Sequence, residues 1–590
     1  RIRTPRFRIW HYPADHLPYE RSRAHGHREQ LNSCPEMPSS KFPPAANGGN
    51  AAEGVARESP EDEVEVDLTT QDVGEEEGAP RAATRGGKVL TEQSINPLVV
   101  KCKYGVRGEI FQRAQELVRE GCKVIFTSLG NPHQLGQPPL TFLRQVLALC
   151  AAPFLMDDPA TARAFPPDAV ARARRYLKEL KGGVGAYQDS RGNLHICKEV
   201  CEFIERRDGG SRPKPEDIFL TNGASHGVKT VLQVMIRGEG DGIMVPIPQY
   251  PLFSAAIALF GGTLIGYHLS EVSGWALDVD RMQAAFDKAR REGITVRAVV
   301  VINPGNPTGQ CLSVVQLQQL VHFAYANRLV LLADEVYQEN VYSTVQFSSC
   351  YKVLQNMGAP YVAEQELVSF HSISKGVAGE CGLRGGYFHI TNFDPVVRAN
   401  LYKLVSISLC ASVPGMVALG CLVNPPREGD PSFELYRRER DATLGSLKRR
   451  ARMMSEAFNS MPGISCQLVE GALYAFPRIA LPPSAVAAAR GRGRAPDVFY
   501  CRELLERALV AATPGSSFEQ EDGTYHFRTT ILPPEDGFEE IMERFRKFHF
   551  DFMKWYGGLG QEAKPPAPVG RGSHEEEEEE LFAPAAPSEC

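Results

Sequence analysis

Over residues 88–558, short apolar runs alternate with longer segments in which apolar residues recur at helical spacing. Short apolar or β-branched runs at 298–302, 329–333 and 367–370 predict buried strands. The longer segment 314–327 has its apolar residues at helical spacing and predicts a helix between two of these strands. Short apolar runs separated by helical patterns are typical of parallel strands joined by crossover helices. The pattern therefore predicts an α/β fold with a mostly parallel central sheet.

Three stretches contain no Asp, Glu, Lys or Arg: residues 242–267, 298–327 and 404–426. Their length alone would suit membrane spans. Each is interrupted, however, by proline, glycine or polar residues, in PIPQYP, NPGNPTG and ASVPG. We interpret them as buried strands and helices of the α/β core, and we expect no membrane as a partner.

The two ends of the chain differ in composition from the part between them. Residues 1–30 carry seven arginines, residues 51–77 carry eleven acids and a single base, and residues 575–580 are all Glu. Such segments bury too little apolar surface to offset the entropy of ordering them. We predict a disordered extension over 1–87 and a disordered acidic tail over 559–590. The Arg-rich start also suits the remnant of a transit peptide, so the location is expected to be cytoplasmic or mitochondrial.

The overall composition allows a sizeable core and excludes few partners by itself. The chain has 590 residues, of which 43% are hydrophobic, and its formal net charge is -6. A charge so near neutral gives no reason to expect nucleic acid as a partner. The fourteen cysteines form no CxxC pair, which favours reduced thiols over a disulfide framework or a zinc site. We expect no bound metal.

Polar motifs follow the apolar runs directly. NPGNPTG comes after 298–302, DEVY after 329–333, and HSISKG followed by GLRGGY after 367–370. Upstream, NGASHG opens an apolar helix. Ligands of parallel sheets bind at the carboxyl ends of the strands. The sequence therefore predicts that an amide, an acid with a phenol, and a lysine with an arginine meet at one edge of the sheet.

This set of groups matches the requirements of pyridoxal 5'-phosphate. Its aldehyde needs an amine, and its ring nitrogen needs a carboxylate because the protonated ring acts as an electron sink. Its phosphate needs hydroxyls, a cation and the free amides of a helix start. Taken singly, each of these features is common, since a lone lysine is usually a surface residue and an Asp after an apolar run is often a helix cap. Their occurrence together and in order indicates one cofactor site.

These motifs carry a family resemblance. The chain resembles the class I/II aminotransferases of the pyridoxal-phosphate fold type I superfamily in PIPQYPLF, VINPGNPTGQ, LLADEVYQENVY and SFHSISKG. GECGLRGGY and TYHFRTTILPP are similar to the alanine aminotransferase group within it. The resemblance covers about residues 88–556. It implies a large cofactor domain over 165–430, with a mostly parallel sheet flanked by helices, and a smaller α+β domain built from both ends, 88–164 and 431–558.

The resemblance also assigns roles to single residues. Lys375 would bind the cofactor aldehyde and then move a proton as general base and acid. Asp334 would hold the ring nitrogen, and Asn306 and Tyr337 would hydrogen-bond the ring oxygen. Tyr250 would stack on the ring. The phosphate would be bound by residues at the helix start and after the third strand: Ala224, Ser225, Ser372, Ser374 and Arg384.

The substrate and the partner subunit are assigned in the same way. Arg528 would clamp the α-carboxylate of the substrate, because a planar guanidinium binds a carboxylate through two hydrogen bonds. Gly130 would line the pocket with its backbone, and Asn306 would also face the substrate. Tyr187 would reach the phosphate of a partner subunit, which implies a homodimer. The other partners would be small-molecule amino acids and 2-oxo acids.

The implied reaction moves the amino group of L-alanine to 2-oxoglutarate and gives pyruvate and L-glutamate by a ping-pong scheme. A glutamate:glyoxylate aminotransferase or another amino-acid aminotransferase of the same family is the alternative, because such enzymes use the same cofactor and the same carboxylate clamp. A synthase or lyase acting on an amino acid is a further alternative. A regulatory protein that kept only the fold would be expected to lose Lys375, Asp334 or Arg384, and all three are present. The loop GNPHQLG and Val377 depart from the usual pattern near the pocket.

Overall fold

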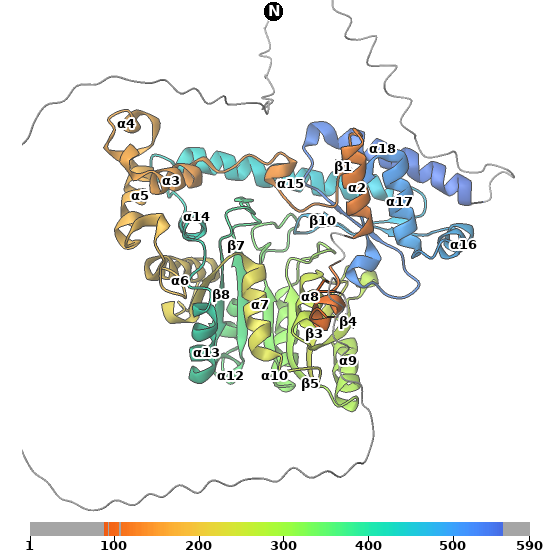
Figure 1. Cartoon of the computed structure of the whole chain (residues 1–590), viewed down its shortest axis with the longest axis horizontal. Coiled ribbons are helices and arrows are strands. Elements are labelled where there is room, and N and C mark those ends of the chain that lie inside the picture. The colour runs from red at the N-terminus through yellow and green to blue at the C-terminus, as the bar shows by residue number, and fades with distance from the viewer. Residues whose placement is uncertain (1–87, 92–93, 105–107, 558–590) are drawn as a thin grey trace, which may run out of the picture. The chain divides into compact units, whose positions relative to one another are not determined.

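The protein is described by a computed structural model that covers residues 88–91, 94–104 and 108–557. The segments expected to be disordered, 1–87 and 559–590, lie outside these described residues. The helices and strands that surround the candidate site all belong to the described part (Figure 1).

A seven-stranded sheet forms the centre of the fold, in the order β2-β8-β7-β6-β5-β3-β4. Only β8 runs against the other strands, so the prediction of a mostly parallel sheet is confirmed. The three predicted apolar runs lie in β5, β6 and β7. The strands are β2 (Ile218–Thr221), β3 (Asp241–Ile247), β4 (Thr263–His268), β5 (Thr295–Ile302), β6 (Val330–Asp334), β7 (Leu367–Ser372) and β8 (Gly386–Thr391).

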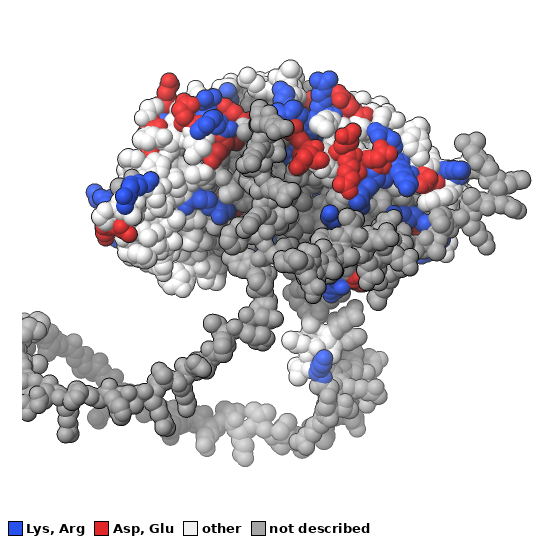
Figure 2. All heavy atoms as spheres, turned by 90° about the horizontal axis from the view of Figure 1, so that it is seen from above, with Lys and Arg blue, Asp and Glu red and all other residues white. Residues whose placement is uncertain are grey.

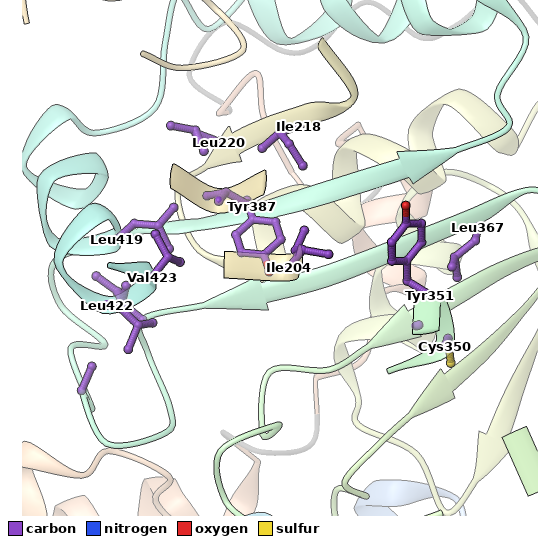
Figure 3. Packing of buried hydrophobic residues seen from close by; sticks show 14 of the residues in the cluster. Ile204, Ile218, Leu220, Cys350, Tyr351, Leu367, Tyr387, Leu419, Leu422 and Val423 are labelled. Atoms are coloured by element: carbon purple, nitrogen blue, oxygen red, sulfur yellow. The ribbon is translucent and has the colours of Figure 1, made fainter. Parts of the chain in front are cut away.

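Helices cover both faces of this sheet, which explains why its strands are continuous apolar runs. Because side chains alternate along a strand, Val300 and Leu332 pack on one face with α7 (Ala224–Met235), α8 (Leu252–Leu259) and α13 (Pro395–Ser406). Val301 and Leu331 pack on the other face. Figure 3 shows part of the core on that second face, where residues of β2, β8, α6 (Leu194–Asp208) and α14 (Val413–Val423) gather around one another.

The helices on the second face include α10, which occupies the segment predicted to be helical between β5 and β6. The charge-free stretch 404–426 contains α14, and the stretch 242–267 contains most of β3 with α8 and β4. No helix in the described part of the chain is long and apolar enough to span a bilayer. The helices on this face and its flanks are α3 (Thr141–Ala151), α5 (Pro167–Glu179), α6 (Leu194–Asp208), α9 (Val279–Arg291), α10 (Val314–Ala326), α11 (Cys350–Met357) and α14 (Val413–Val423).

A second group of small sheets is built from segments far apart in the sequence. β1 (Ile125–Phe126) pairs with β12 (Val510–Ala511), and β10 (Tyr474–Ala475) pairs with β14 (Phe527–Thr530), which in turn pairs with β13 (Thr513–Pro514). Their apolar side chains form a core of their own. The domain boundaries at 164 and 430 remain a prediction. The helices around this core are α2 (Glu109–Arg119), α15 (Phe433–Asn459), α16 (Pro483–Gly491), α17 (Pro496–Ala508) and α18 (Glu535–Tyr556); three short helices complete the set, α1 (Pro97–Lys101), α4 (Thr161–Ala164) and α12 (Tyr361–Glu364).

Basic and acidic side chains lie interspersed on the face of the molecule seen in Figure 2. The ion pairs at the surface of the described residues include Arg437 with Glu434 at 2.9 Å and Arg449 with Glu535 at 2.8 Å. Exposed pairs of this kind add little stability. Because charges of both signs are mixed there, the described residues on this face form no large patch of a single sign.

Candidate active site

The carboxyl ends of three adjacent strands form the base of the site. In the ladder, Ile302 at the end of β5 lies opposite Asp334 at the end of β6, which in turn lies opposite Phe370 of β7. The loop that begins at Asn303 and the turn that contains Lys375 therefore leave the sheet at the same edge as Asp334. The structure brings together the groups that the sequence placed there.

Asp334 is a buried carboxyl group with few hydrogen-bond donors near it. Burial raises the pKa of Asp334 to about 6, although the N–H of Val336, 3.4 Å from Oδ1, and the charge of Lys375 oppose the shift. A carboxylate taken out of water in this way is stabilised by any cation placed beside it. The position therefore suits a protonated ring nitrogen.

Lys375 lies in the turn after β7, and its amine points to the loop that contains Gly130. Its Nζ donates to the carbonyl oxygen of Gly130 at 2.5 Å and lies 6.0 Å from the ring centroid of Tyr337. A Cβ on Gly130 would lie 3.3 Å from Nζ and would overlap the hydroxyl of Tyr474. A side chain at position 130 would thus block the approach to the amine, which explains the glycine.

Arg528 lies on β14 and is almost completely buried, with 1% of its surface exposed. It donates to the backbone oxygen of Ser128 at 2.9 Å and to Oδ1 of Asn306 at 3.2 Å, and its Nε has no hydrogen-bond partner among the residues that the structure describes. No carboxylate of the described residues forms an ion pair with it. A buried guanidinium without an anion is costly, so the site is arranged for an incoming carboxylate.

Arg384 and the start of α7 form a second seat for an anion. Arg384 donates to the backbone oxygens of Asn222 and Cys381, each at 2.8 Å, and a Cβ on Gly223 would lie 2.7 Å from its Nη2. Ala224 and Ser225 form the first turn of α7, which no side chain of the described residues caps. The free amides of this turn and the adjacent guanidinium together favour a phosphate.

Ser372 and Ser374 lie beside this seat. The N–H of Ser374 lies 3.3 Å from Oγ of Ser372, and Ser372 pairs with Gly386, two residues after Arg384. The site thus offers an amine, a buried carboxyl group, an amide, a phenol and an anion seat at one edge of the sheet. These donors and acceptors fit pyridoxal phosphate.

The comparison with known sequences identifies the family. The family described as "Aminotransferase class I and II" matches residues 155–545. The chain belongs to this family. Its fold is that of the fold type I aminotransferases, as predicted.

Several members of the aminotransferase family are similar over most of the chain. Glutamate–glyoxylate aminotransferase 1 of Arabidopsis thaliana is 54% identical over 470 residues, which are 80% of this chain and 98% of that protein. Alanine aminotransferase 1 of Bos taurus is 48% identical over 482 residues, which are 80% of this chain and 96% of that protein. The solved structure of an alanine aminotransferase from Pyrococcus furiosus superposes with a TM-score of 0.62 at 24% identity, covering 78% of this chain and all of that one.

Two tyrosines of this aminotransferase that were predicted from the sequence have different surroundings. Tyr250 lies in the site: burial raises the pKa of its phenol, the charge of Arg528 opposes that shift, and its hydroxyl lies 3.1 Å from that of Tyr104. Tyr187, in contrast, has 76% of its surface exposed. Its expected contact is with a partner subunit, and this assignment remains a prediction.

Tyr474 is a residue of the site that the sequence did not reveal. Burial would raise the pKa of its phenol, but the charges of Arg528 and Lys375 and a hydrogen bond from Tyr337 lower it. In the sequence it stands in the apolar run GALYAF, where a buried tyrosine is indistinguishable from a core residue. Only the pairing of Tyr474 with Thr530 of β14 places it beside Arg528.

The structure gives no sign of a metal centre among the residues it describes. No three His, Cys, Asp or Glu side chains within the described ranges are grouped as ligands of a metal ion.

Proposed function

We propose that this aminotransferase moves the amino group of L-alanine to 2-oxoglutarate and forms pyruvate and L-glutamate. One observation carries the proposal: Arg528 is buried with no anionic partner in the described part of the chain, and Tyr474 lies close to both its guanidinium and the amine of Lys375. An amino acid held by its carboxylate on Arg528 would present its α-carbon to a lysine. The similarity to alanine aminotransferases over 80% of the chain supports this substrate class.

Pyridoxal phosphate is the cofactor that we assign to this site. Asp334 would hold its ring nitrogen, and Asn306 and Tyr337 would hydrogen-bond its ring oxygen. Its phosphate would be held by Ala224, Ser225, Ser372, Ser374 and Arg384. When bound, the cofactor supplies an electron sink for the negative charge that develops at the substrate α-carbon.

The protein residues then have two tasks. Arg528 fixes the substrate carboxylate, with Asn306 and the loop of Gly130 beside it. Lys375 takes the proton from the α-carbon of the substrate and returns a proton when the second substrate reacts. The same two side chains serve both half-reactions, because pyruvate and 2-oxoglutarate each carry a carboxylate next to the carbonyl carbon. Burial of Asp334, Tyr337 and Arg528 keeps water from the charged groups.

We also propose a homodimer, in which Tyr187 of one subunit reaches the phosphate seat of the other. The exposure of its ring in a single chain supports this assignment, since large exposed aromatic side chains are typical of interfaces. The location that we propose is the cytoplasm or the mitochondrion.

Transfer from glutamate to glyoxylate is the second candidate. It is favoured by the 54% identity to glutamate–glyoxylate aminotransferase 1 of Arabidopsis thaliana, which exceeds the 48% identity to alanine aminotransferase 1 of Bos taurus. Both reactions need the same lysine and the same carboxylate clamp. They share the half-reaction that interconverts glutamate and 2-oxoglutarate. They differ in the other half-reaction, which involves alanine and pyruvate in the first case and glyoxylate, which has no side chain, in the second.

Steady-state assays of the purified protein with alanine and glutamate as donors, and pyruvate, 2-oxoglutarate and glyoxylate as acceptors, test the proposal. We expect the highest kcat/KM for alanine with 2-oxoglutarate. A higher value for glutamate with glyoxylate would select the second candidate. Lys375→Ala, checked for folding by circular dichroism, should show no turnover with any pair, and normal turnover in this variant would contradict the mechanism.

A further inference from the structure

Tyr474 lies between the two side chains on which the proposed reaction depends. It is buried on β10, and a Cβ added at Gly130 would overlap its hydroxyl and would lie 3.3 Å from Nζ of Lys375, so the hydroxyl and the amine flank the same point. The same ring lies against Arg528. One tyrosine is thus in reach of both the carboxylate clamp and the lysine that would move the proton.

The ring of Tyr474 supports the guanidinium of Arg528. The Cζ atom of Arg528 lies 4.0 Å from the ring centroid of Tyr474 and 4.7 Å from that of Phe518. Two aromatic rings therefore hold a cation that has no anionic partner among the described residues. Such contacts are worth most where water is excluded, and they leave the edge of the guanidinium free for hydrogen bonds.

The hydroxyl of Tyr474 belongs to the surroundings of the lysine. The ring of Tyr474 meets the ring of Tyr337 edge to face, with the two centroids 6.3 Å apart. Burial would raise the pKa of this phenol, but the positive charges of Arg528 and Lys375 lower it. A phenol oxygen that lies between two cationic side chains can accept a hydrogen bond from an ammonium group.

We propose that Tyr474 is a positioning residue. It keeps the guanidinium of Arg528 and the amine of Lys375 at fixed positions relative to each other. Its ring keeps the Arg528 guanidinium in place, and its hydroxyl fixes the Lys375 amine next to the α-carbon of a bound substrate. The inference rests on the proposed function, because it takes Arg528 as the carboxylate site. It adds a residue to which the resemblance assigned no role.

The two parts of the side chain have separable effects. Tyr474→Phe keeps the ring and removes the hydroxyl. Arg528 should then bind a carboxylate as in the wild type, while proton transfer by Lys375 becomes slower. Tyr474→Leu removes both, so carboxylate binding should weaken as well. Tyr500→Phe is the matched control, because Tyr500 is a buried tyrosine of the same core whose hydroxyl meets Nδ1 of His549 at 3.0 Å instead.

The test measures binding and turnover separately on the cofactor-loaded enzyme. Calorimetry gives the Kd of propionate, a carboxylate that has no amino or keto group, and steady-state assays with alanine and 2-oxoglutarate give kcat and KM. We expect Tyr474→Leu to raise the Kd of propionate about tenfold or more. We expect Tyr474→Phe to change it less than about twofold while lowering kcat by about tenfold or more. Tyr500→Phe should match the wild type in both.

Each outcome decides the inference. Wild-type affinity for propionate in Tyr474→Leu would overturn the role of the ring, and a wild-type kcat in Tyr474→Phe would overturn the role of the hydroxyl. If Tyr474→Leu fails to fold, Tyr474→Met provides a second variant without a ring. Failure of the proposed function would look different, because Arg528→Lys would then bind propionate as tightly as the wild type does.

Discussion

At the scale of single residues, the carboxyl group of Asp334 determines how the cofactor-free protein responds to pH. Burial raises the pKa of Asp334 from 3.8 to about 6, so the folded state keeps a proton that the unfolded chain has already lost in this range. Stability should therefore fall as the pH rises from about 4 to about 6 and stay lower above it. Asp334→Asn removes this dependence. At pH 8 we expect the variant without cofactor to be more stable than the wild type by up to about 3 kcal/mol.

Unfolding midpoints of the cofactor-free proteins at pH 4.5 and pH 8 measure this effect, with cofactor affinity as the second readout. Asp334→Asn should bind pyridoxal phosphate weakly, because the cation at the ring nitrogen loses its partner. Glu335→Gln is the control: burial raises the pKa of Glu335 to about 7, but its Oε1 accepts from the N–H of Cys350. It should gain stability in the same way and keep its cofactor affinity. An Asp334→Asn protein that is less stable than the wild type at pH 8 would contradict the argument.

Site residues with polar or charged side chains next to apolar runs could be predicted from the sequence. A site residue that stands within an apolar run, like a residue of the hydrophobic core, could not. Lys375, Asp334 and Arg528 follow strands or stand in polar motifs, so their side chains call for an explanation. Tyr474 stands in an apolar run, and its role depends on a strand pairing between segments more than fifty residues apart. Tyr187 is the opposite case, since its predicted contact lies in another subunit.

At the scale of elements, α14 holds the loop of Arg384 in place by close backbone packing. A Cβ on Gly415 would lie 2.7 Å from the backbone oxygens of Leu383 and Arg384, and neither oxygen can move without the loop. Arg384 itself has a positive φ of 57°, which the loop must enforce. We expect Gly415→Ala to cost about 1–3 kcal/mol of stability and to weaken cofactor binding about tenfold. Thermal unfolding and a cofactor titration measure both.

Gly445 provides the matched control for this substitution. It lies inside α15, and a Cβ there would meet only Nη1 of Arg449, at an ordinary 3.5 Å. Gly445→Ala should therefore stabilise the protein by about 0.5–1 kcal/mol through helix propensity, with cofactor affinity unchanged. If both alanine variants were equally stable, the close packing of α14 would have no energetic consequence.

The long elements could be predicted from the sequence because their periodicity extends over many residues. The runs in β5, β6 and β7 are apolar on both faces, since helices cover both sides of the sheet. The strands that complete the candidate site could not be predicted in this way. β1, β10, β12 and β13 have two residues each, which is too short for any period to show, and their pairing depends on the folded arrangement.

At the scale of the whole molecule, the exposed ring of Tyr187 predicts that each active site is shared between two subunits. If Tyr187 acts on the partner's phosphate seat, defects in Tyr187 and in Lys375 should complement each other. A dimer of one Tyr187→Ala subunit and one Lys375→Ala subunit contains one site with both wild-type residues. Random pairing makes half of the dimers mixed, so an equal mixture should reach about a quarter of wild-type activity.

Coexpression of the two variants with different affinity tags, followed by purification on both tags, isolates the mixed dimer, which should have about half of wild-type activity because one of its two sites is intact. The control pairs Lys375→Ala with Arg384→Ala. Arg384 lies in the same chain as the phosphate seat that it serves, where it donates to Asn222 and Cys381, so this mixed dimer has no intact site and should stay inactive. Activity in the Tyr187 pairing that does not exceed the mean of its two parents would place Tyr187 outside the partner's site. Because the control shares one parent with the test, recovery in the first pairing alone requires a residue that crosses the interface.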